Sequence, residues 1–563
     1  METERKREEL EALLEPFMEM EGALLPALHK LQDTYGYVDR EMHEAIERKL
    51  GINTAAAASV QSFYRFFNRK PAGKYVIRLC DSAPCHMKRS DVLLKAFEDA
   101  LQISAGETTP DGRFTLLTAG CIGACDRAPA ALINDRIYGP LKPEEVQELL
   151  KGLDHCPDDE RTAALETYLA DGGYRGLQKA VLKPEEIIPE LTAAGLRGLS
   201  GSGFPTGTKW LTTSKEDADR KYIVCNADEG EPGTMKDRSI LEQCPHAVIE
   251  GMGIAAAATG AQKGFIYLRR EYGYLIPALK KAMEEAGQAG FLGKDICGSG
   301  NSFEIELRLG AGAYICGEET ALLESMEGRR GTPRLKPPFP GVKGLWQKPT
   351  VINNVETLAA VPAIIRNGAK AYRSCGTQKC PGKKRITLSG NIERPGVYEI
   401  PMGTRVRDIY ENYGGGSLNG KKLMAVQTGG QSGTVMTPDF LDIKFDPESC
   451  REAGGFFGTG DLLFITEDVD LLELLENMTG FFVEESCGKC IPCRVGLVHV
   501  KTLLGKLARG ESGPDDLTGL EQLADQIRQT ARCAFGSAAV TPVLSALANF
   551  RPVFEQAAVK GGF

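Results

Sequence analysis

The stretch that decides the fold of the C-terminal part is Glu485-Ser486-Cys487-Gly488-Lys489-Cys490-Ile491-Pro492-Cys493-Arg494. Its three cysteines are each separated by two residues, and Cys533 follows forty residues after Cys493. A short loop with this spacing supplies three ligands of a [4Fe-4S] cluster, and a remote cysteine supplies the fourth. Structural zinc is the competing metal, although zinc sites more often use two separated pairs of ligands. Unliganded cysteines packed as small apolar residues are the remaining alternative, which the polar flanks of the loop disfavour.

Length, charge and cysteine content restrict the class of protein. The chain has 563 residues, which predicts about three to five domains. A net charge of −9 argues against the basic footprint of a nucleic-acid-binding protein. The N-terminal segment lacks the apolar core of a signal peptide, and no stretch approaches the roughly 18 apolar residues of a membrane span. We therefore expect a cytoplasmic protein without a nucleic-acid partner, which meets a membrane only through another subunit.

The first quarter begins with helices and continues with a cysteine-containing segment. From Glu4 to about Phe67, apolar residues recur at spacings of three and four, which predicts a helical bundle. After the breaker Pro71-Ala72-Gly73, a strand is expected over residues 75–79, a helix over about 90–100 and a second strand over 114–118. Cysteines follow the two strands as Cys80, Cys85, Cys121 and Cys125.

These four cysteines are enough to hold one [2Fe-2S] cluster. The pattern is C-x4-C, thirty-five residues, and C-x3-C, and zinc or a redox-active cysteine pair are the alternatives. Gly120 and Gly123 allow the backbone to approach closely and leave N–H groups free to bond cluster sulfurs. The helical segment, the four cysteines and the segment Cys121-Ile-Gly-Ala-Cys125-Asp-Arg-Ala-Pro129 together resemble the 24-kDa subunit of respiratory complex I, a thioredoxin-like [2Fe-2S] protein.

A polar segment, Asp154-His155-Cys156-Pro157-Asp158-Asp159-Glu160, predicts a domain boundary before a glycine-dense region. In that region, residues 195–210 carry repeated glycines and Lys209, a combination that can cradle a phosphate but is more often only a turn. In residues 224–238, an apolar strand is followed by acidic residues and an asparagine. These side chains can form hydrogen bonds with a flavin, or the segment can be a solvated acidic loop. A third segment, residues 312–322, opens a helix, and Pro349 to Thr357 lies beyond it.

Together these segments resemble the 51-kDa flavoprotein subunit of complex I and its relatives in NAD-linked hydrogenases and formate dehydrogenases, from about Asp171 to the C-terminus. The resemblance implies bound FMN and NADH as the substrate. The positions it implies for FMN are Gly198, Gly201, Gly203, Lys209, Asn226, Asp228, Glu229, Tyr314, Gly317, Glu318, Glu319, Asn353, Asn354 and Thr357. The positions it implies for NADH are Phe204, Glu231, Glu319, Lys336 and Phe339.

One position departs from the family pattern. Relatives have arginine where this chain has Leu199. Loss of a fixed positive charge near the flavin disfavours the reduced, anionic flavin, so the potential or the occupancy of the flavin is expected to differ.

The remaining segments complete the predicted architecture. Strands over 385–390, 396–400 and 460–465 resemble the ubiquitin-like β-grasp insert of the same family. Cys375 and Cys380 lack a second cysteine pair, and we interpret them as incidental. The final helical segment carries the metal ligands Cys487, Cys490, Cys493 and Cys533. The fold class is therefore α/β and α+β multidomain. The expected domains are a helical bundle over 1–70, a thioredoxin-like [2Fe-2S] domain over 71–153, a Rossmann-like FMN and NADH domain over 154–383, a β-grasp domain over 384–467 and a helical [4Fe-4S] domain over 468–563.

The predicted function is that of an NADH dehydrogenase (diaphorase) module. NADH gives up two electrons as a hydride, whereas each cluster accepts one electron, so FMN stands between them. Electrons then reach other redox subunits of a multi-subunit oxidoreductase. The alternative within the enzyme class is the NAD-linked subunit of a formate dehydrogenase, a hydrogenase or an electron-bifurcating reductase. From a different class, a flavin-free electron-relay scaffold is suggested by Leu199.

Overall fold

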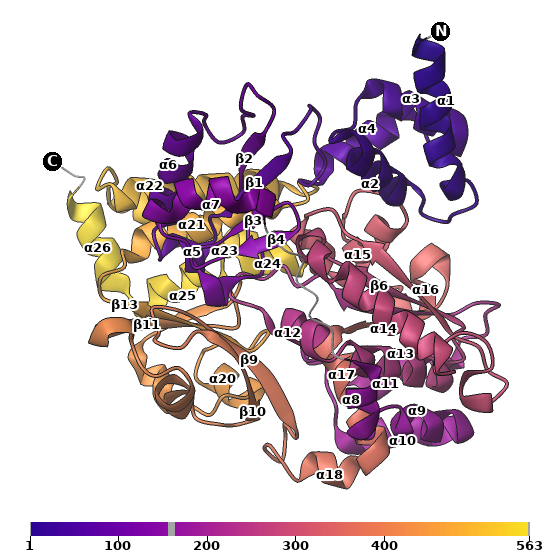
Figure 1. Ribbon diagram of the computed structural model, residues 1–563. Coiled ribbons are helices and arrows are strands. Elements are labelled where there is room, and N and C mark those ends of the chain that lie inside the picture. The colour runs from indigo at the N-terminus through magenta and orange to yellow at the C-terminus, as the bar shows by residue number, and fades with distance from the viewer. Residues whose placement is uncertain (1, 156–163, 561–563) are drawn as a thin grey trace.

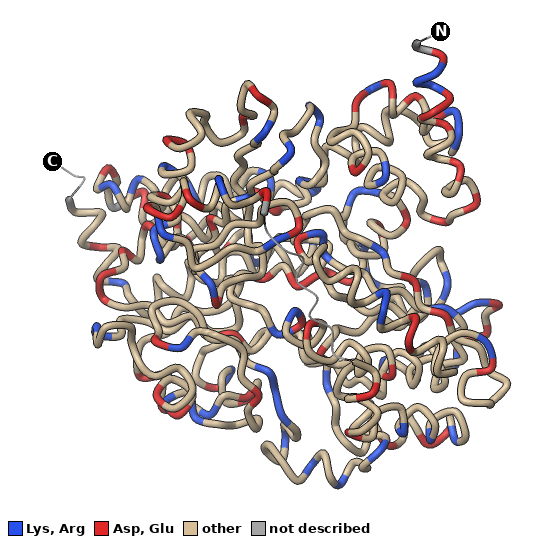
Figure 2. The backbone as a smooth tube through the Cα atoms, in the orientation of Figure 1, with Lys and Arg blue, Asp and Glu red and all other residues tan. Residues whose placement is uncertain are grey.

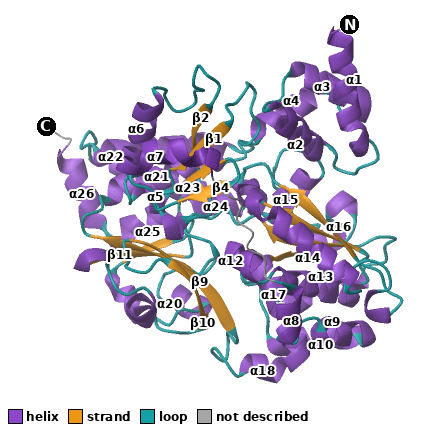
Figure 3. Cartoon of the chain, in the orientation of Figure 1, coloured by secondary structure: helices purple, strands orange, loops and turns teal. Residues whose placement is uncertain are grey.

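The computed structural model describes residues 2–155 and 164–560, in which helices surround separate sheets (Figures 1 and 3). Residues 156–160 of the predicted linker lie outside the described residues. Acidic and basic residues are interspersed along the backbone (Figure 2).

The predicted N-terminal helices are present. They are α1 (Glu2–Leu14), α2 (Leu24–Tyr35), α3 (Arg40–Leu50) and α4 (Thr54–Phe63). Asp39 caps the start of α3 by accepting a hydrogen bond from the Met42 N–H, and Gly36 and Gly51 end α2 and α3 in the left-handed conformation. The buried face of α2 reaches the following domains, because His29 bonds the carbonyl of Gly310 at 3.0 Å.

The next segment forms a small sheet with strand order β2-β1-β3-β4. Its elements are β1 (Tyr75–Cys80), α5 (Ala83–His86), α6 (Ser90–Leu101), β2 (Phe114–Ala119), β3 (Ala131–Ile133), β4 (Arg136–Tyr138) and α7 (Val146–Gly152). β1 and β2 are parallel, whereas β3 runs antiparallel to β1. Parallel pairing brings the ends of β1 and β2 to the same edge, and this edge carries Cys80 and Cys121.

The central sheet is parallel and has strand order β7-β6-β5-β8. Its strands are β5 (Tyr222–Ala227), β6 (Lys263–Leu268), β7 (Glu304–Leu309) and β8 (Thr350–Asn354). The helices around it include α9 (Arg175–Leu182), α10 (Pro184–Ala194), α11 (Thr206–Lys215), α12 (Lys236–Gln243), α13 (Pro245–Thr259), α14 (Ile276–Gln288), α15 (Glu319–Met326) and α17 (Val355–Asn367). Alternate residues of β5 enter different core clusters, so both faces of the sheet are buried.

The strand order places a topological switch point between β5 and β8. The chain adds β6 and β7 on one side of β5 and then adds β8 on the other side. Ligands of open α/β sheets bind outside the carboxyl ends of the strands at such a point. In this sheet those ends carry Asn226 and Asn354, which are register partners.

A third sheet has strand order β10-β9-β13-β11-β12. Its strands are β9 (Lys383–Gly390), β10 (Gly396–Pro401), β11 (Leu423–Thr428), β12 (Thr434–Met436) and β13 (Asp461–Thr466). β9 and β13 are parallel and the other pairs are antiparallel. The short helix α20 (Pro447–Glu452) precedes β13. This mixed sheet agrees with the predicted β-grasp fold, and β11 and β12 are additional to the predicted strands.

The chain ends in helices that pack on the rest of the molecule (Figure 1). They are α21 (Leu471–Glu485), α22 (Leu497–Ala508), α23 (Pro514–Thr530), α24 (Ala534–Ala539), α25 (Thr541–Asn549) and α26 (Arg551–Lys560). One hydrophobic cluster contains buried residues of α2, β5 and α21, so the N-terminal helices, the central sheet and the C-terminal helices share a core.

Candidate functional site

The four predicted [2Fe-2S] ligands converge at one edge of the small sheet. Cys80 ends β1, Cys85 lies in α5, and Cys121 and Cys125 follow β2, and all four are buried. The Sγ atoms of Cys121 and Cys125 are 3.6 Å apart, and the Cys80 side chain contacts those of Cys121 and Cys85. Four converging sulfurs fit the ligand set of a [2Fe-2S] cluster.

The surroundings of Cys121 favour a thiolate. Hydrogen bonds from the Cys125 and Cys80 thiols, and then the charge of Arg269, lower the pKa of Cys121 well below its usual value. The Gly123 N–H lies 3.3 Å from the Cys121 Sγ, as expected from the glycine in this loop. Gly120 has another role, since a Cβ there would lie 3.2 Å from the Phe481 ring of α21.

The loop after β5 packs directly against this cysteine cluster. The Gly233 N–H donates to the Cys125 Sγ at 3.3 Å, and the Asp126 N–H lies 2.9 Å from the Met235 Sδ. The Arg238 guanidinium bonds the Gly123 carbonyl at 2.6 Å and the Asp126 carboxylate at 2.8 Å. The predicted flavin and [2Fe-2S] sites are therefore adjacent.

The glycine-rich loop before α11 has the backbone geometry that its sequence suggests. Gly201 and Gly203 have φ values of 102° and 59°, a region that L residues rarely adopt. A Cβ at Gly201 would lie 3.2 Å from the backbone of Gly458, so the segment that precedes β13 approaches this loop. Gly198 closes the loop through a hydrogen bond from its N–H to the Phe204 carbonyl at 2.9 Å.

Polar groups at the end of β5 and in the turn Tyr314–Gly317, which precedes α15, meet at the switch point. The Asn226 Nδ2 donates to the Gly317 carbonyl at 2.8 Å, and the Asn226 Oδ1 accepts from the Asp228 N–H at 3.1 Å. A Cβ at Gly317 would lie 3.2 Å from the Asp228 carbonyl oxygen, so glycine permits this close approach. Burial raises the pKa of the Asp228 carboxyl, which accepts no hydrogen bond from the described residues. This carboxyl is a suitable acceptor for a ligand hydroxyl or N–H.

The end of β8 supplies two amides with different surroundings. The Asn353 Oδ1 accepts from the Trp210 indole at 2.8 Å. The Asn354 Oδ1 accepts from Lys236 at 3.0 Å and caps α17 through the Glu356 N–H, and its Nδ2 donates to Asp237 at 2.5 Å. The Asn354 side chain is therefore already engaged by the protein.

Two other predicted flavin positions have internal roles. Glu229 accepts hydrogen bonds from the N–H groups of Asp237 and Arg238 at 2.8 and 3.1 Å, at the start of α12. Burial, followed by the charge of Asp237, raises the pKa of Glu229 to about 8. Thr357 accepts a hydrogen bond from the Leu199 N–H at 3.0 Å, while the Leu199 side chain is buried in the core.

A charged group forms where α15 begins. Glu318 caps this helix by accepting from the N–H groups of Thr320 and Ala321, both at 2.9 Å. Glu319 pairs with Lys209 at 3.2 Å and with Lys336 at 3.0 Å. Burial favours the neutral acid, but the two lysines lower the pKa of Glu319. Lys209 also donates to the Ile352 carbonyl at 2.9 Å, so it joins β8 to α15.

The predicted NADH positions differ in exposure and in their contacts with the protein. Lys336 and Glu319 are paired, and the rings of Phe204 and Phe339 are 49% and 57% exposed. Glu231 is buried, and it accepts hydrogen bonds from the Tyr314 hydroxyl and from the Ser432 N–H at 2.7 Å. Burial raises the pKa of Glu231 to about 7.

The predicted [4Fe-4S] ligands come from two segments. Cys487 and Cys490 lie in the loop after α21, Cys493 follows in a short helical turn, and Cys533 caps α24. Burial and then the neighbouring Cys490 raise the pKa of Cys493. The Arg532 N–H bonds the Cys490 sulfur, which ties the two segments together. A Cβ at Gly536 would lie 2.6 Å from the Cys493 Sγ, so only glycine fits there.

Tyr314 connects the central sheet to this loop. Its N–H donates to Glu485, two residues before Cys487, at 2.9 Å. Its ring lies 5.1 Å from that of Phe481 and 5.7 Å from that of Phe535, measured between centroids. The three predicted redox sites are thus in contiguous contact through protein atoms.

Comparisons with known proteins agree with this arrangement. Family models match the thioredoxin-like [2Fe-2S] ferredoxin over 10–154, the Nuo51 FMN-binding domain over 191–363, the SLBB domain over 385–439 and the NADH-ubiquinone oxidoreductase-F iron-sulfur binding region over 473–557. The NAD-reducing hydrogenase HoxS subunit alpha of Cupriavidus necator is 35% identical, and the match covers 97% of this chain and 94% of that one. The chain belongs to the family of flavoprotein subunits of NADH-quinone oxidoreductases and NAD-reducing hydrogenases.

Two further family members show the same relationship. An NADH-quinone oxidoreductase subunit of Rhizobium meliloti is 45% identical over 72% of this chain and 96% of its own length. The crystal structure of an NAD+-reducing [NiFe]-hydrogenase in the air-oxidized state matches with a TM-score of 0.85 at 34% identity, covering 95% of this chain and 93% of that one. Family membership confirms the predicted NADH-dependent oxidoreductase class and the predicted FMN, [2Fe-2S] and [4Fe-4S] cofactors.

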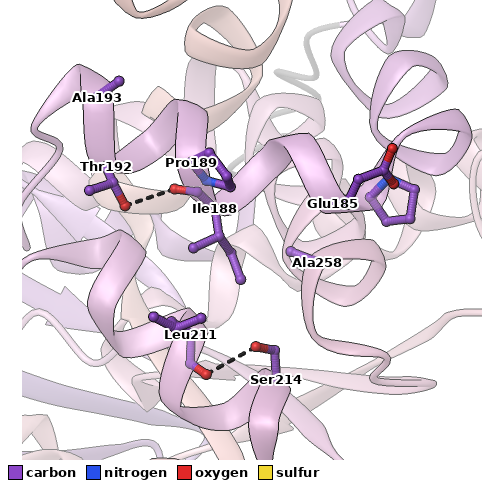
Figure 4. A pocket seen from close by; sticks show the side chains of 9 residues that line it. Glu185, Ile188, Pro189, Thr192, Ala193, Leu211, Ser214 and Ala258 are labelled. Atoms are coloured by element: carbon purple, nitrogen blue, oxygen red, sulfur yellow. Dashed lines mark hydrogen bonds between the residues drawn. The ribbon is translucent and has the colours of Figure 1, made fainter.

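Other features of this family member are separate from the redox sites. An open groove of about 750 Å³ lies between α10 and α11 (Figure 4). Thr192 and Ser214 line it, but their hydroxyls already donate to backbone carbonyls at 2.8 and 3.0 Å. None of the predicted site residues lines this groove. Among the described residues, no helix has both the length and the apolar character needed to cross a membrane.

Cys380 lies near two carboxylates, those of Asp446 and Glu448, with ligand atoms within 4.8 Å of one another. The Cys380 thiol donates to Glu448 at 2.6 Å, Asp446 caps α20, and Glu448 pairs with Arg197 at 3.1 Å. These groups form hydrogen bonds, a helix cap and an ion pair within the protein. We therefore keep the interpretation that Cys380 is incidental to the redox chemistry.

Sequence reasoning missed several residues that build the site. Arg269 donates to the Cys121 carbonyl at 2.5 Å, and Met235 is completely buried beside Cys121 and Cys125. Arg269 directly follows β6 at the edge where ligands bind, which is the signal that could have identified it. Met235 lies within the segment 224–238, but its contact with distant cysteines leaves no local pattern.

Proposed function

We propose that this chain oxidises NADH at FMN and delivers single electrons to a partner protein through its clusters, with the reverse direction also available. The observation that carries the proposal is the direct contact between sites. Gly233 of the flavin domain bonds Cys125, and Tyr314 of the same domain bonds Glu485 beside Cys487. Bound FMN supplies two-electron exchange with the nicotinamide and one-electron exchange with the clusters.

We assign the holding of FMN to the carboxyl ends of β5 and β8. The Asp228 carboxyl, which accepts no hydrogen bond from the described residues, can accept a hydrogen bond from the ligand, and the Asn353 amide can donate one. The glycine loop with Gly201 and Gly203 offers close backbone approach for the phosphate. The side chains of Asn354 and Glu229 already form hydrogen bonds with other protein groups. Their role is therefore to position the strand ends and α12.

We assign the binding of NADH to the exposed rings of Phe204 and Phe339 and to the charged group at α15. Large rings left exposed on a folded protein are suitable for stacking on a base or a nicotinamide. Lys336 and Glu319 provide opposite charges close by. Glu231, which was predicted as an NADH contact, is instead proposed to hold Tyr314 in place through their hydrogen bond.

We place the exit for electrons at the loop that holds the [4Fe-4S] ligands. Ile491, Val495 and Val498 next to Cys490 and Cys493 are exposed at 66%, 41% and 45%. The cations Lys489, Arg494 and Arg532 surround this face and have no carboxylate partner among the described residues. An apolar centre with a basic rim fits a partner redox protein with an acidic rim.

The fused architecture favours the hydrogenase-type assembly over complex I itself. The HoxS subunit alpha matches over nearly its full length and 97% of this chain, whereas the Rhizobium oxidoreductase protein matches only 72% of this chain. We therefore propose that the partner belongs to an NAD-linked hydrogenase or a related reductase, and that the assembly is cytoplasmic. We also propose that the domains end at residues 70, 153, 383 and 467, as the sequence predicts.

Anaerobic reduction by NADH tests this function. The purified chain is mixed with NADH, the flavin absorbance and the cluster electron paramagnetic resonance (EPR) signals are followed, and turnover with a dye acceptor is measured. Bleaching of the flavin together with appearance of reduced clusters is the expected result. A protein without flavin that carries both clusters would instead support the electron-relay scaffold.

A further inference from the structure

A second cavity, of about 220 Å³, lies where the small sheet, the central sheet and α21 meet. Its lining includes Arg65, Arg78, Cys121, Tyr314 and Glu485. It is therefore bounded by a [2Fe-2S] ligand, by the flavin domain and by the helix that leads to the [4Fe-4S] loop. None of the proposed roles above uses this space.

Arg78 points into this region from β1. Its neighbours Ile77 and Leu79 enter the core of the small sheet, so Arg78 lies on the opposite face, which it shares with Cys80. The Arg78 side chain is only 6% exposed, and its guanidinium lies 4.2 Å from the centroid of the Phe66 ring. This cation–π contact covers one face of the guanidinium but satisfies none of its N–H donors.

The other charges around the cavity are already paired. Arg65 pairs with Glu484 at 3.0 Å and with Glu485 at 3.6 Å. Arg269 pairs with Glu271 at 3.0 Å. Glu485 also accepts the Tyr314 N–H, and the nearby Arg270 pairs with Asp135. Within the described part of the chain, the Arg78 side chain makes neither a hydrogen bond nor an ion pair.

A buried charge without a partner is strongly unfavourable. Taking a lone ion out of water costs several kcal/mol, whereas a charged partner with good geometry offsets this cost. The flat fork of N–H donors on a guanidinium matches halide and oxyanion ligands. A cavity of about 220 Å³ has room for a compact anion and a few waters, since a water occupies about 30 Å³ in the liquid.

We propose that this cavity is a binding site for a small inorganic anion held by Arg78. The bound anion neutralises the Arg78 charge beside the [2Fe-2S] ligands. Because a nearby negative charge disfavours the reduced cluster, anion binding lowers the midpoint potential of the [2Fe-2S] centre. The anion composition of the medium would thereby set the midpoint potential of the [2Fe-2S] centre.

Titration of the holoprotein with defined anions tests the proposal. The protein is prepared in a gluconate buffer, which contains neither halide nor phosphate and serves as the reference medium. Chloride and phosphate are then added in separate experiments at constant ionic strength. The thermal midpoint and the EPR-monitored potential of the [2Fe-2S] cluster are recorded at each concentration. We expect a saturable rise in the thermal midpoint and a saturable fall in the potential. The tighter of the two anions identifies a halide site or an oxyanion site.

Three variants separate binding at Arg78 from general effects of salt. In Arg78→Gln the half-saturating anion concentration is expected to increase at least about tenfold. Arg78→Lys keeps the charge and retains weaker binding. Arg113→Gln removes an exposed arginine of the same domain that pairs with Asp154, and it is expected to behave as the parent.

A bromide soak of parent crystals adds a readout that does not depend on redox activity. An anomalous peak at hydrogen-bonding distance from the Arg78 guanidinium is expected. Absence of saturation in the parent with both anions overturns the proposal. An unchanged response in a folded, iron-loaded Arg78→Gln protein overturns it as well.

Discussion

The backbone N–H of Gly233 lies 3.3 Å from the Sγ of Cys125, although the two residues belong to different predicted domains. This hydrogen bond joins the loop after β5 to a ligand of the [2Fe-2S] site. Arg238 strengthens the same contact through Gly123 and Asp126. The small ferredoxin sheet is therefore docked on the flavin domain by polar contacts that converge at the cluster ligands.

Loss of Arg238 is expected to undock the ferredoxin sheet. Its side chain is buried and pairs with Asp126, so Arg238→Met leaves a partly buried carboxylate without its partner. Breaking such a pair costs on the order of 3–5 kcal/mol. We expect a lower urea midpoint and faster limited proteolysis of the chain, with Arg113→Met as the control at a partly exposed ion pair. A stability equal to that of the parent would show that the docking does not depend on this pair.

Metal content distinguishes the cluster assignments. The two cysteine sets predict about six iron atoms and one FMN for each chain after anaerobic purification. Cys80→Ser is expected to remove about two of the six iron atoms without loss of FMN. Metal analysis and the flavin spectrum measure both quantities. Zinc in place of iron contradicts the assignments, and about four iron atoms in the parent would leave the Cys80 set without a cluster.

Cys490→Ser is expected to separate the two halves of the reaction. Reduction of the flavin by NADH needs only the flavin domain and persists. Transfer to the partner protein needs the [4Fe-4S] site and is lost, while small dyes are still reduced. Cys375→Ser, outside both cysteine sets, serves as the control. Partner-dependent turnover of Cys490→Ser at the parent rate would place this cluster off the electron path.

His29 is expected to make the fold sensitive to acid. Burial, followed by the charge of Arg270, lowers the pKa of His29 to about 3, compared with about 6.5 in the unfolded chain. Below pH 6.5 the unfolded chain therefore binds a proton that the folded chain does not. Stability falls as the pH decreases through this window, by about 1.4 kcal/mol for each pH unit.

His29→Gln removes this titration while it retains a donor for the Gly310 carbonyl. The difference between the urea midpoints of parent and variant should grow as the pH is lowered from about 7 to about 5. His499→Gln, at an exposed position of α22, provides the comparison. A parallel pH dependence in parent and His29→Gln would assign the acid sensitivity to other groups.

The cluster ligands could be predicted because their spacing is local. The three cysteines from Cys487 to Cys493 lie within one loop at the spacing of cluster ligands. The strands that precede Cys80 and Cys121 are recognisable from their runs of apolar residues. The packing of Met235 on Cys125 could not be predicted in this way, since it depends on how two sheets dock. The hydrogen bonds between Glu229 and the start of α12 could not be predicted either, because an acidic residue after a strand can equally be a ligand-binding residue or a helix cap.

The choice between NADH and NADPH depends on the charged group at α15. A 2′-phosphate carries nearly two negative charges, whereas a carboxylate suits the free 2′-hydroxyl of NADH. Glu319 is the acid expected to face this position, and the structure shows that it pairs with Lys209 and Lys336. In the parent these lysines are occupied by the carboxylate, so they are not free for a phosphate. A strong preference for NADH is expected, on the order of 1–3 kcal/mol or roughly fivefold to a hundredfold.

Glu319→Ala should relax this preference for two reasons that act together. It removes the repelling carboxylate, and it releases Lys209 from its carboxylate partner while Lys336 keeps only its contact with Glu318 at 3.1 Å. The ratio of kcat/KM for NADH to that for NADPH, measured with a dye acceptor, is expected to fall by about tenfold or more. Lys336→Met in the Glu319→Ala background should reverse part of this gain, because it removes one of the two cations that lie beside position 319. Glu319 also lies in the first turn of α15, where any acid is stabilising. If Glu319→Ala lowers the thermal midpoint but leaves the ratio unchanged, stabilisation of the helix is its only role.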